Sequence, residues 1–520
     1  MPRLSRRHTV WSSVIAEAPW LVGAGLAAGA LLSVVPHLNH PWGSNWPMYF
    51  EAARFFWDPT AAYFGWRPPL YPLLLATVGQ SFGYVQAAHW IAQASMVVVV
   101  FSAAWLARLC VGRGGAVIAA LSIPLLQCAV EGAMWTNMYP PAAATMTLAC
   151  ALSVLLYRRP MLFGALIAGL ACGLAWRINH LGLVAIPLGL GMAIVGARSR
   201  RHLVMLPMLF GVGTSTAVAL DAWVVDRWNV PQESLSDQVI QRRREELDRI
   251  ASGQSDPAMF SECTGLEPRP LNLEELTSGC AQQFVEANYG TLRTEDCAPP
   301  VSMLAWLMPL ALLPSARRRS WRDSAAAVLL FGGPLGAFLI AAAWTSYAEK
   351  YVISYLGIMV LVAPMAFDRL GGWLGRLVDH VDGGRALGVL AAAAWAIASW
   401  PGATTTRADT PNIQLDWESV AGEVAEWAKD SLEPEDLLID CVPLNVDLVM
   451  LPRAAQIKKG VSIQSDCMAW VARPPRSEGQ TFLVQQAFDG HPHTGPAHIE
   501  AMGWVLVRQL DDRHRLWRRP

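Results

Sequence analysis

The sequence is short of charge, and its cations include almost no lysine. Charged residues make up 16% of the 520 positions, whereas soluble globular proteins carry about a quarter. Only 4 of the 40 Lys and Arg residues are lysines. The formal net charge of -1 excludes a generally basic nucleic-acid-binding protein and an acidic disordered chain. Together with a hydrophobic content of 53%, the low charge argues against a string of soluble domains.

Two metal- and nucleotide-binding patterns are also missing. No GxxxxGK[ST] loop occurs, which excludes the usual phosphate-binding loop, and no CxxC pair predicts zinc. For the cysteines in or near apolar segments we predict buried packing; they are Cys110, Cys128, Cys150 and Cys172. The five others fall in hydrophilic stretches, where an oxidising compartment would allow disulfides and an odd number leaves at least one unpaired.

Long apolar segments are what the sequence has in abundance. A run of roughly 20 apolar residues can cross a bilayer as a helix, because every backbone group is then hydrogen-bonded internally. We count eleven such segments, several of them short: residues 20–36, 84–107, 115–130, 139–156, 162–175, 181–195, 203–225, 301–313, 324–344, 351–367 and 387–400. The fold class predicted is therefore a polytopic α-helical membrane protein with about 11 transmembrane helices.

Arginine is distributed unevenly between alternate connections. If the N-terminus is inside, the inside connections carry 17 cations and 5 acids, which fits the positive-inside rule. We therefore predict a cytoplasmic N-terminus and a transmembrane domain over residues 1–400. Two long outer loops, at 37–83 and 226–300, and a C-terminal tail at 401–520 would then lie outside.

The tail has the pattern of a soluble domain. Val420, Val424 and Ala428, with Trp417 and Trp427, form a helical stripe. Residues 437–442, 481–488 and 504–510 read as short strands between turn-forming stretches. We expect a small extracytoplasmic α/β domain here.

The first outer loop is the stretch richest in chemical detail. Met48, Ala52, Phe55 and Phe56 would share one helical face beside Tyr49, as in a helix that lies in the membrane interface. The sequence Arg67-Pro68-Pro69-Leu70-Tyr71 then ends one helix and begins another. Arg67 would lie at the outer surface, where a cation can meet a lipid phosphate or simply reach toward water.

The order of motifs resembles a known family. The loop with Ala52-Ala53-Arg54 and Arg67-Pro68-Pro69-Leu70-Tyr71, the glycine-rich span from Gly164 to Trp176-Arg177, and Glu349-Lys350-Tyr351 are similar to those of the GT-C superfamily. These are polyprenyl-phosphate-sugar-dependent glycosyltransferases, and the branch indicated contains the protein-O-mannosyltransferase-like and aminoarabinose-transferase-like enzymes. The resemblance covers most of the chain.

The resemblance implies a set of site residues. The donor phosphate would be bound by cations and polar groups at the outer boundary: Arg67, Tyr71, Arg177, His180, Lys350 and Tyr351. The family's catalytic acid in the first outer loop corresponds to Asn45, and its second acid corresponds to Asn137. An amide cannot accept a proton as a base, so Glu51, Asp58 and Glu131 are the candidate bases.

The function that the resemblance implies is transfer of a sugar from a polyprenyl-phosphate donor to an extracytoplasmic lipid, glycan or protein, at a bacterial inner membrane. Two alternatives stay open: a non-catalytic protein that binds lipid-linked sugar, and, with less support, a transporter or flippase. No cofactor is indicated with certainty, although a divalent metal would be compatible. Asp221, an acid near the end of an apolar span, is either functional or paired with Arg227.

Overall fold

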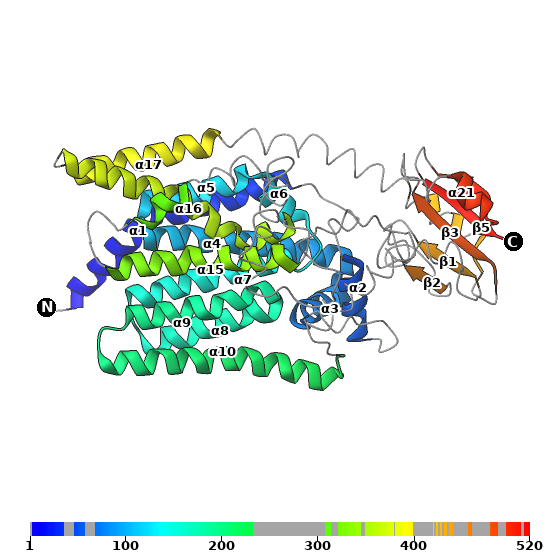
Figure 1. Cartoon of the computed structure of the whole chain (residues 1–520), viewed down its shortest axis with the longest axis horizontal. Helices are drawn as coiled ribbons and strands as arrows, with labels where there is room; N and C mark the ends of the chain where they lie inside the picture. Colours follow the sequence, from blue (N-terminus) through cyan, green and yellow to red (C-terminus); the bar gives the residue numbers. More distant parts are fainter. Residues whose placement is uncertain are drawn as a thin grey trace.

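The computed structural model shows a helical bundle with a β-sheet beyond one of its ends (Figure 1). The residues it describes are 3–35, 46–57, 68–231, 307–313, 321–344, 349–378, 380–398, 420, 423–424, 427–428, 431–433, 436–440, 456–459, 479–486, 496–510 and 514–520. The named helices of the bundle are α1 (Arg3–Val34), α2 (Trp46–Phe55), α3 (Leu70–Phe82), α4 (Tyr84–Cys110), α5 (Arg113–Ser122), α6 (Gln127–Met134), α7 (Tyr139–Arg158), α8 (Leu162–Ile178), α9 (Ala185–Gly196), α10 (Arg200–Trp228), α15 (Trp321–Trp344), α16 (Glu349–Leu377) and α17 (Val381–Ala398).

The connections predicted to lie inside share one end of the bundle. Arg108, at the end of α4, bonds Glu17 of α1, and Arg198 donates to the carbonyl oxygen of Arg158 at 2.9 Å. Arg385, at the start of α17, donates to the carbonyl oxygen of Val111 between α4 and α5. We call this the inner end, after the predicted sidedness, and the opposite end with α2, α3 and α6 the outer end (Figure 1).

The predicted spans match the helices in position better than in number. By length and composition, five helices of the described part can cross a membrane, or six if one bent pair counts as a span. The segment at 115–130 is not the continuous span we predicted. It breaks into α5, a 3-10 turn (η1, Ile123–Leu125) and α6, with a bend of 67°. Pro124 in the turn and extended Leu126 end the hydrogen-bond ladder there.

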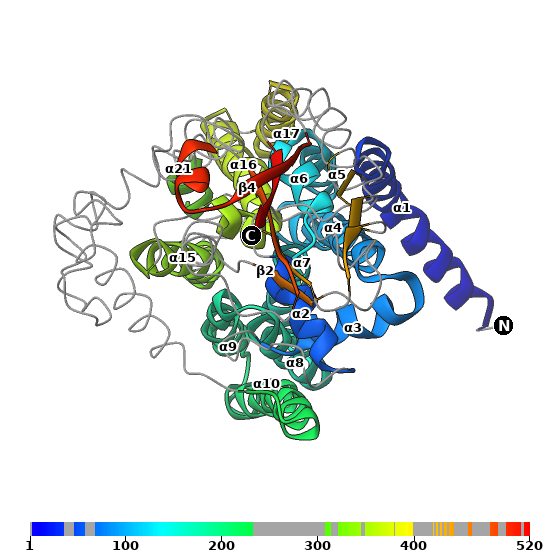
Figure 2. The ribbon, with the colours of Figure 1, turned by 90° about the vertical axis from the view of Figure 1, so that its right-hand side faces the viewer.

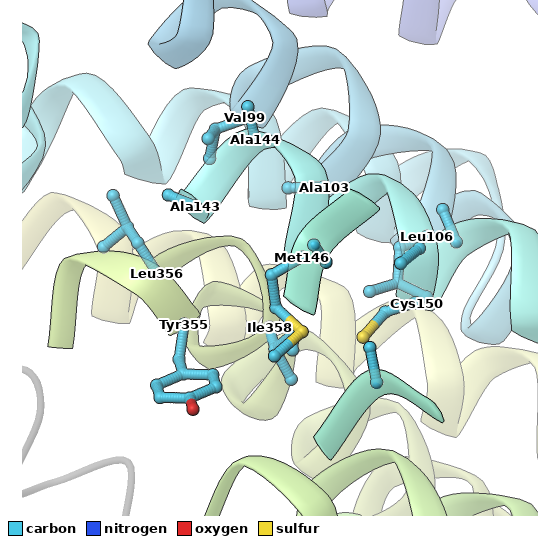
Figure 3. Close-up of a cluster of buried hydrophobic side chains, with 14 of the residues drawn as sticks. Val99, Ala103, Leu106, Ala143, Ala144, Met146, Cys150, Tyr355, Leu356 and Ile358 are labelled. Atoms are coloured by element: carbon cyan, nitrogen blue, oxygen red, sulfur yellow. The ribbon is translucent and has the colours of Figure 1, made fainter. Parts of the chain in front are cut away.

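Helix α7 lies at the centre of the bundle and contacts α4, α8, α9 and α16. Its buried face is made of small side chains, such as Ala143, Ala144 and Cys150, which let neighbouring backbones approach. Figure 3 shows Met146 and Cys150 packed with Leu106 of α4 and Ile358 of α16.

Glycines bring α8 and α10 into backbone contact. A Cβ at Gly169 would lie 2.0 Å from the carbonyl oxygen of Phe210, and one at Gly213 would lie 2.1 Å from that of Leu166. Thr214 donates a hydrogen bond from its Oγ1 to the carbonyl oxygen of Gly169 at 3.1 Å. Such close packing is typical of small residues at helix interfaces in membranes, and it holds the two helices side by side.

The C-terminal part forms a five-stranded sheet in the order β2-β1-β3-β5-β4. Its strands are β1 (Leu437–Asp440), β2 (Gln456–Lys459), β3 (Thr481–Gln486), β4 (Val505–Gln509) and β5 (His514–Arg519). β1 pairs in parallel with β2 and β3, whereas β5 pairs antiparallel with β3 and β4. The predicted strands at 437, 481 and 504 are confirmed, and β2 and β5 were not predicted.

Apolar side chains cover both faces of the sheet. Helical residues Val420 and Val424 pack with Leu438 and Phe482 on one face. Trp504 and Trp517 pack on the other face with Ile499 of α21 (Pro496–Ala501). The helical stripe predicted from the sequence therefore packs on the sheet, at the positions the structure describes.

Candidate functional site at the outer end

Segments far apart in the chain meet at the outer end of the bundle. Looking along the bundle axis, Figure 2 shows α2 and α3 beside the ends of α8 and α10. The Phe56 ring packs edge-on against the Trp228 ring, with centroids 5.5 Å apart, and so joins the end of α2 to the end of α10. The indole N–H of Trp57 donates to the carbonyl oxygen of Ala76, which ties α2 to α3.

Arg177 and Asp221 form a buried ion pair at this end. Arg177 lies in the last turn of α8, and its guanidinium bonds the carboxylate of Asp221 on α10. The Asp221 side chain is 2% exposed and that of Arg177 is 17% exposed. The Arg177 guanidinium also lies over the Trp176 ring, 5.0 Å from its centroid. The alternative partner we considered for Asp221, Arg227, is wrong, because Arg177 takes that place.

Two buried polar atoms of this pair, and one of Asn179, two residues along the chain from Arg177, have no hydrogen-bond partner within the described structure. They are Arg177 Nε, Asp221 Oδ1 and Asn179 Nδ2. Buried polar groups are nearly always hydrogen-bonded, so a cluster of exceptions calls for an explanation. Two of the three atoms are N–H donors, and an oxyanion is the group that such donors bind best.

The chain around Asn179 is built to hold that residue in place. The Asn179 Oδ1 accepts from the backbone N–H of Leu181 at 3.0 Å and caps a short 3-10 helix, η2 (His180–Val184). Tyr355 of α16 donates from its hydroxyl to the carbonyl oxygen of Leu181 at 3.3 Å. His180 opens η2, is half-buried and lies within electrostatic reach of Asp221. Asn179 was not predicted as a site residue, since no spacing in the sequence marks it.

A pair of tyrosines forms the second polar feature of the outer end. The rings of Tyr49 on α2 and Tyr71 on α3 pack edge-on with centroids 5.2 Å apart, and both side chains are buried. The Tyr71 hydroxyl, one of the predicted phosphate ligands, is buried without a hydrogen-bond partner in the described residues. The helix predicted in this loop is present as α2, and its place in a membrane interface stays a prediction. The face that it buries includes Tyr49 and Phe50, displaced from the face we predicted.

Of the two family acid positions, Asn45 and Asn137, the structure describes the second. Asn137 is buried, and its Oδ1 accepts from the backbone N–H of Tyr139 at 3.1 Å, at the start of α7. It therefore serves as a local cap. Glu131 lies on α6 with a half-buried side chain. The Asn45, Asp58 and Arg67 predictions fall outside the described residues, and for Glu51, Lys350 and Tyr351 only the helical backbone of α2 and α16 is described.

Cysteine chemistry differs between the two ends of the bundle. Cys128 on α6 is disulfide-bonded, which corrects our prediction of simple buried packing. Cys110, Cys150 and Cys172 are free. Among the described residues, no group of three or more His, Cys, Asp or Glu side chains could hold a metal ion, so we assign no residue to a metal.

Two proteins of known structure have a fold similar to that of this chain. ArnT from Cupriavidus metallidurans in the apo state superposes with a TM-score of 0.56 and 13% identity over 97% of this chain and 98% of that one. The chain has the GT-C fold. ArnT bound to undecaprenyl phosphate gives a TM-score of 0.54 at 13% identity, covering 96% and 97% of the two chains.

A second GT-C protein is similar over a smaller share of its own length. The oligosaccharyltransferase from Archaeoglobus fulgidus in the apo form gives a TM-score of 0.53 at 15% identity, over 90% of this chain and 69% of that one. No protein-family model and no curated protein matches the sequence. The family resemblance stated from sequence motifs is therefore confirmed at the level of the GT-C fold.

Proposed function

We propose that this protein is an integral-membrane glycosyltransferase that moves a sugar from a polyprenyl-phosphate donor to an extracytoplasmic acceptor. The observation that carries the proposal is the pair of unpartnered buried donors, Arg177 Nε and Asn179 Nδ2, at the outer end of a GT-C fold. A donor phosphate there would satisfy both groups. ArnT, which shares the fold, was solved with undecaprenyl phosphate bound, and this supports the same donor class.

The Arg177–Asp221 pair gives the proposed phosphate site a defined resting state. Without a ligand, Asp221 neutralises the guanidinium, which would otherwise be a costly buried charge. The Nε–H of Arg177 takes no part in the bond to Asp221, so phosphate binding would add a contact and need not break one. Tyr71, His180, Arg67, Lys350 and Tyr351 complete our proposed set of phosphate ligands.

In the proposed reaction, an acceptor hydroxyl oxygen attacks the anomeric carbon of the sugar. The bond from that carbon to the phosphate oxygen breaks, and its electron pair leaves with the polyprenyl phosphate. A carboxylate accepts the hydroxyl proton, and we keep Glu51, Asp58 and Glu131 as the candidate bases. Asn137 is unsuitable, because an amide cannot act as a base and its Oδ1 already caps α7.

The disulfide at Cys128 supports the proposed sidedness. Disulfides persist in oxidising compartments and are rare in the cytosol. Cys128 lies at the outer end, on α6, whereas the free Cys110 lies at the inner end of α4. We therefore propose an extracytoplasmic outer end, a cytoplasmic N-terminus, and a domain boundary near residue 401 that separates the bundle from the sheet, in a bacterial inner membrane.

One alternative keeps specific support. A protein that binds lipid-linked sugar without transferring it would need the phosphate site but no base, and Asn45 and Asn137 stand at the two family acid positions. The transporter alternative has no such support, since the solved proteins of the same fold that we compared are transferases.

The deciding experiment uses a variant that removes the charge of the site without leaving an unpaired ion. Arg177→Gln with Asp221→Asn keeps a neutral hydrogen-bonded pair. We expect this variant in nanodiscs to bind undecaprenyl phosphate at least about tenfold more weakly than the unchanged protein, the equivalent of about 1.4 kcal/mol. The matched control is Glu17→Gln with Arg108→Gln at the inner end, which should bind normally. Equal binding by both variants would refute the phosphate site.

Transfer is then tested separately from binding. Labelled sugar on a polyprenyl-phosphate donor should move to envelope acceptors in membranes that contain the protein. One of Glu51→Gln, Asp58→Asn and Glu131→Gln should abolish transfer while leaving donor binding intact. Donor binding without any transfer would favour the non-catalytic alternative.

A further inference from the structure

The sheet beyond the outer end carries a shallow pocket of about 300 Å³. It lies at the edge of the area in which helical residues pack on one face of the sheet. Phe482 of β3 pairs across with Arg518 of β5, and Arg518 pairs with Val505 of β4, so the three side chains form a row across three strands. The helical residues around Trp427 cover the Phe482 end of the row and leave the Arg518 and Val505 end open.

The pocket combines one aromatic wall with three polar side chains. The Trp427 ring is held edge-on against the Phe482 ring, with centroids 4.8 Å apart. Ser431, Gln480 and Arg518 line the rest of the pocket and are exposed. Sites of this kind, with an apolar wall and a few placed polar groups, are typical of small-ligand binding.

Asp436 joins the two segments that carry the polar lining. This buried carboxylate accepts from the backbone N–H of Gln480 at 2.6 Å and from that of Glu433 at 3.0 Å. The carbonyl oxygen of Gln480 accepts a hydrogen bond from the backbone N–H of Leu437 at 2.9 Å. The Ser431 and Gln480 positions are therefore fixed relative to one another by the fold.

Among the described residues that line the pocket, the charged side chain is that of Arg518. The Arg518 side chain forms no ion pair or hydrogen bond within the described part of the chain, and none of the described residues that line the pocket is acidic. The contrast is Arg508 on the neighbouring strand, which pairs with Glu423 at 3.4 Å and does not line the pocket.

The edge strand extends the apolar wall. Val505, Leu506 and Val507 are consecutive and are 47%, 41% and 41% exposed, although all three are large hydrophobic residues. A register shift between Leu506 and Arg508 lets Val507 face the pocket beside its neighbours. Native sheets rarely leave such an apolar edge uncovered without a function.

We propose that this pocket, defined by Trp427, Gln480, Phe482 and Arg518, binds an anionic sugar unit of the acceptor. A sugar ring offers an apolar C–H face to the Trp427 wall and hydroxyls to Ser431 and Gln480. A carboxylate or phosphate on the sugar would pair with the Arg518 guanidinium. The role as acceptor site rests on the proposed transferase function, and the binding itself does not.

The location fits that role. Figures 1 and 2 together show the sheet displaced along the bundle axis from the outer end and lying over the middle of the bundle. An acceptor held in the pocket would therefore be on the same side of the bundle as the proposed phosphate site.

The test uses the full chain in nanodiscs and a tetramer of galacturonic acid as a carboxylated sugar probe. We expect saturable binding to the unchanged protein, and at least about tenfold weaker binding of neutral maltotetraose. Arg518→Gln and Trp427→Ala should each weaken binding of the galacturonate probe about tenfold or more. Arg508→Gln is the matched control and should bind as the unchanged protein does.

Several outcomes would overturn the proposal. No saturable binding of the probe, or equal binding by Arg518→Gln and Arg508→Gln, would remove the site. If the protein binds inorganic phosphate and Trp427→Ala leaves the affinity for the probe unchanged, the pocket is an anion site without sugar recognition. If an extended peptide binds along β4 in preference to the sugar, the site recognises a peptide strand. Undecaprenyl phosphate binding should be unchanged in all these variants, so failure here is distinct from failure of the donor site.

Discussion

Two arginine–carboxylate pairs stand at opposite ends of the helical bundle, and their surroundings differ. At the inner end, Arg108 bonds both carboxylate oxygens of Glu17, at 2.9 and 2.7 Å, and Trp20 donates to the same carboxylate at 2.6 Å. At the outer end, Arg177 and Asp221 share one contact, and each keeps a buried atom without a partner. The first pair is complete, whereas the second has unused hydrogen-bonding capacity.

The difference separates a structural contact from a candidate binding site. The side chains of Glu17 and Arg108 are 36% and 32% exposed, so water can solvate them. This pair is a structural contact between α1 and α4. Asp221 is almost fully buried. Unused donors in such a place cost stability, and a ligand that uses them recovers that cost.

The largest effect on stability is expected when the Asp221 carboxylate is removed and Arg177 is kept. Asp221→Ala leaves the Arg177 guanidinium buried and unpaired, which we expect to destabilise the protein by about 3–5 kcal/mol. Arg177→Met with Asp221→Leu should recover most of that loss, because an apolar pair needs no desolvation of charge. Thermal unfolding in detergent measures both. A single variant as stable as the unchanged protein would mean that Arg177 has another partner.

The next prediction concerns a substitution that disturbs the packing of α8 against α10 and leaves both residues of the ion pair unchanged. Gly169→Ala would place a Cβ against the Phe210 carbonyl oxygen, so we expect a loss of about 3 kcal/mol and weaker undecaprenyl phosphate binding as Arg177 and Asp221 move apart. Gly211→Ala is the matched control on α10, since nothing lies within 4 Å of its added Cβ. It should leave stability unchanged or raise it by up to about 1 kcal/mol.

The sequence predicts the positions of the helices but not how they face one another. The apolar run 139–156 became α7 and the run 84–107 became α4, because Arg and Gly at their ends mark the boundaries. The pairing of Arg177 with Asp221 joins residues 44 positions apart. It depends on the rotation of two helices about their axes, which the glycine contacts of α8 and α10 determine. Arg227 is on the same helix as Asp221, but six residues at 3.6 per turn place it about 240° around the axis.

In the sheet, too, the sequence predicts single strands better than the way they pair. β1, β3 and β4 each contain three consecutive apolar residues, at 437–439, 482–484 and 505–507, and such short apolar runs predict strands. β5 buries the consecutive residues Leu516 and Trp517 on opposite faces of the sheet, but its sequence HRLWRR resembles a charged tail more than a strand. The pairing of Arg518 with Phe482 and Val505 follows from strand order, which no local pattern encodes.

A third prediction uses the cysteines to test which end of the bundle is extracytoplasmic. In protein denatured without reductant, a thiol reagent should label Cys110, Cys150 and Cys172 and leave Cys128 unlabelled until a reductant is added. Cys128→Ser should cost on the order of 2 kcal/mol, measured by thermal unfolding with and without reductant. Labelling of Cys128 before reduction would remove the support that this disulfide gives to an extracytoplasmic outer end.

The smallest predicted effect comes from the completed pair at the inner end. Glu17→Ala removes a carboxylate that is one-third exposed, and Arg108 remains solvated near Arg113. We expect a loss below about 1 kcal/mol, reduced further by added salt, because exposed ion pairs are weak and screened. Unfolding at low and high ionic strength provides the measurement, with Asp221→Ala in parallel. A loss from Glu17→Ala as large as that from Asp221→Ala would show that burial does not distinguish the two pairs. The unused atoms at the outer end would then be no sign of a ligand.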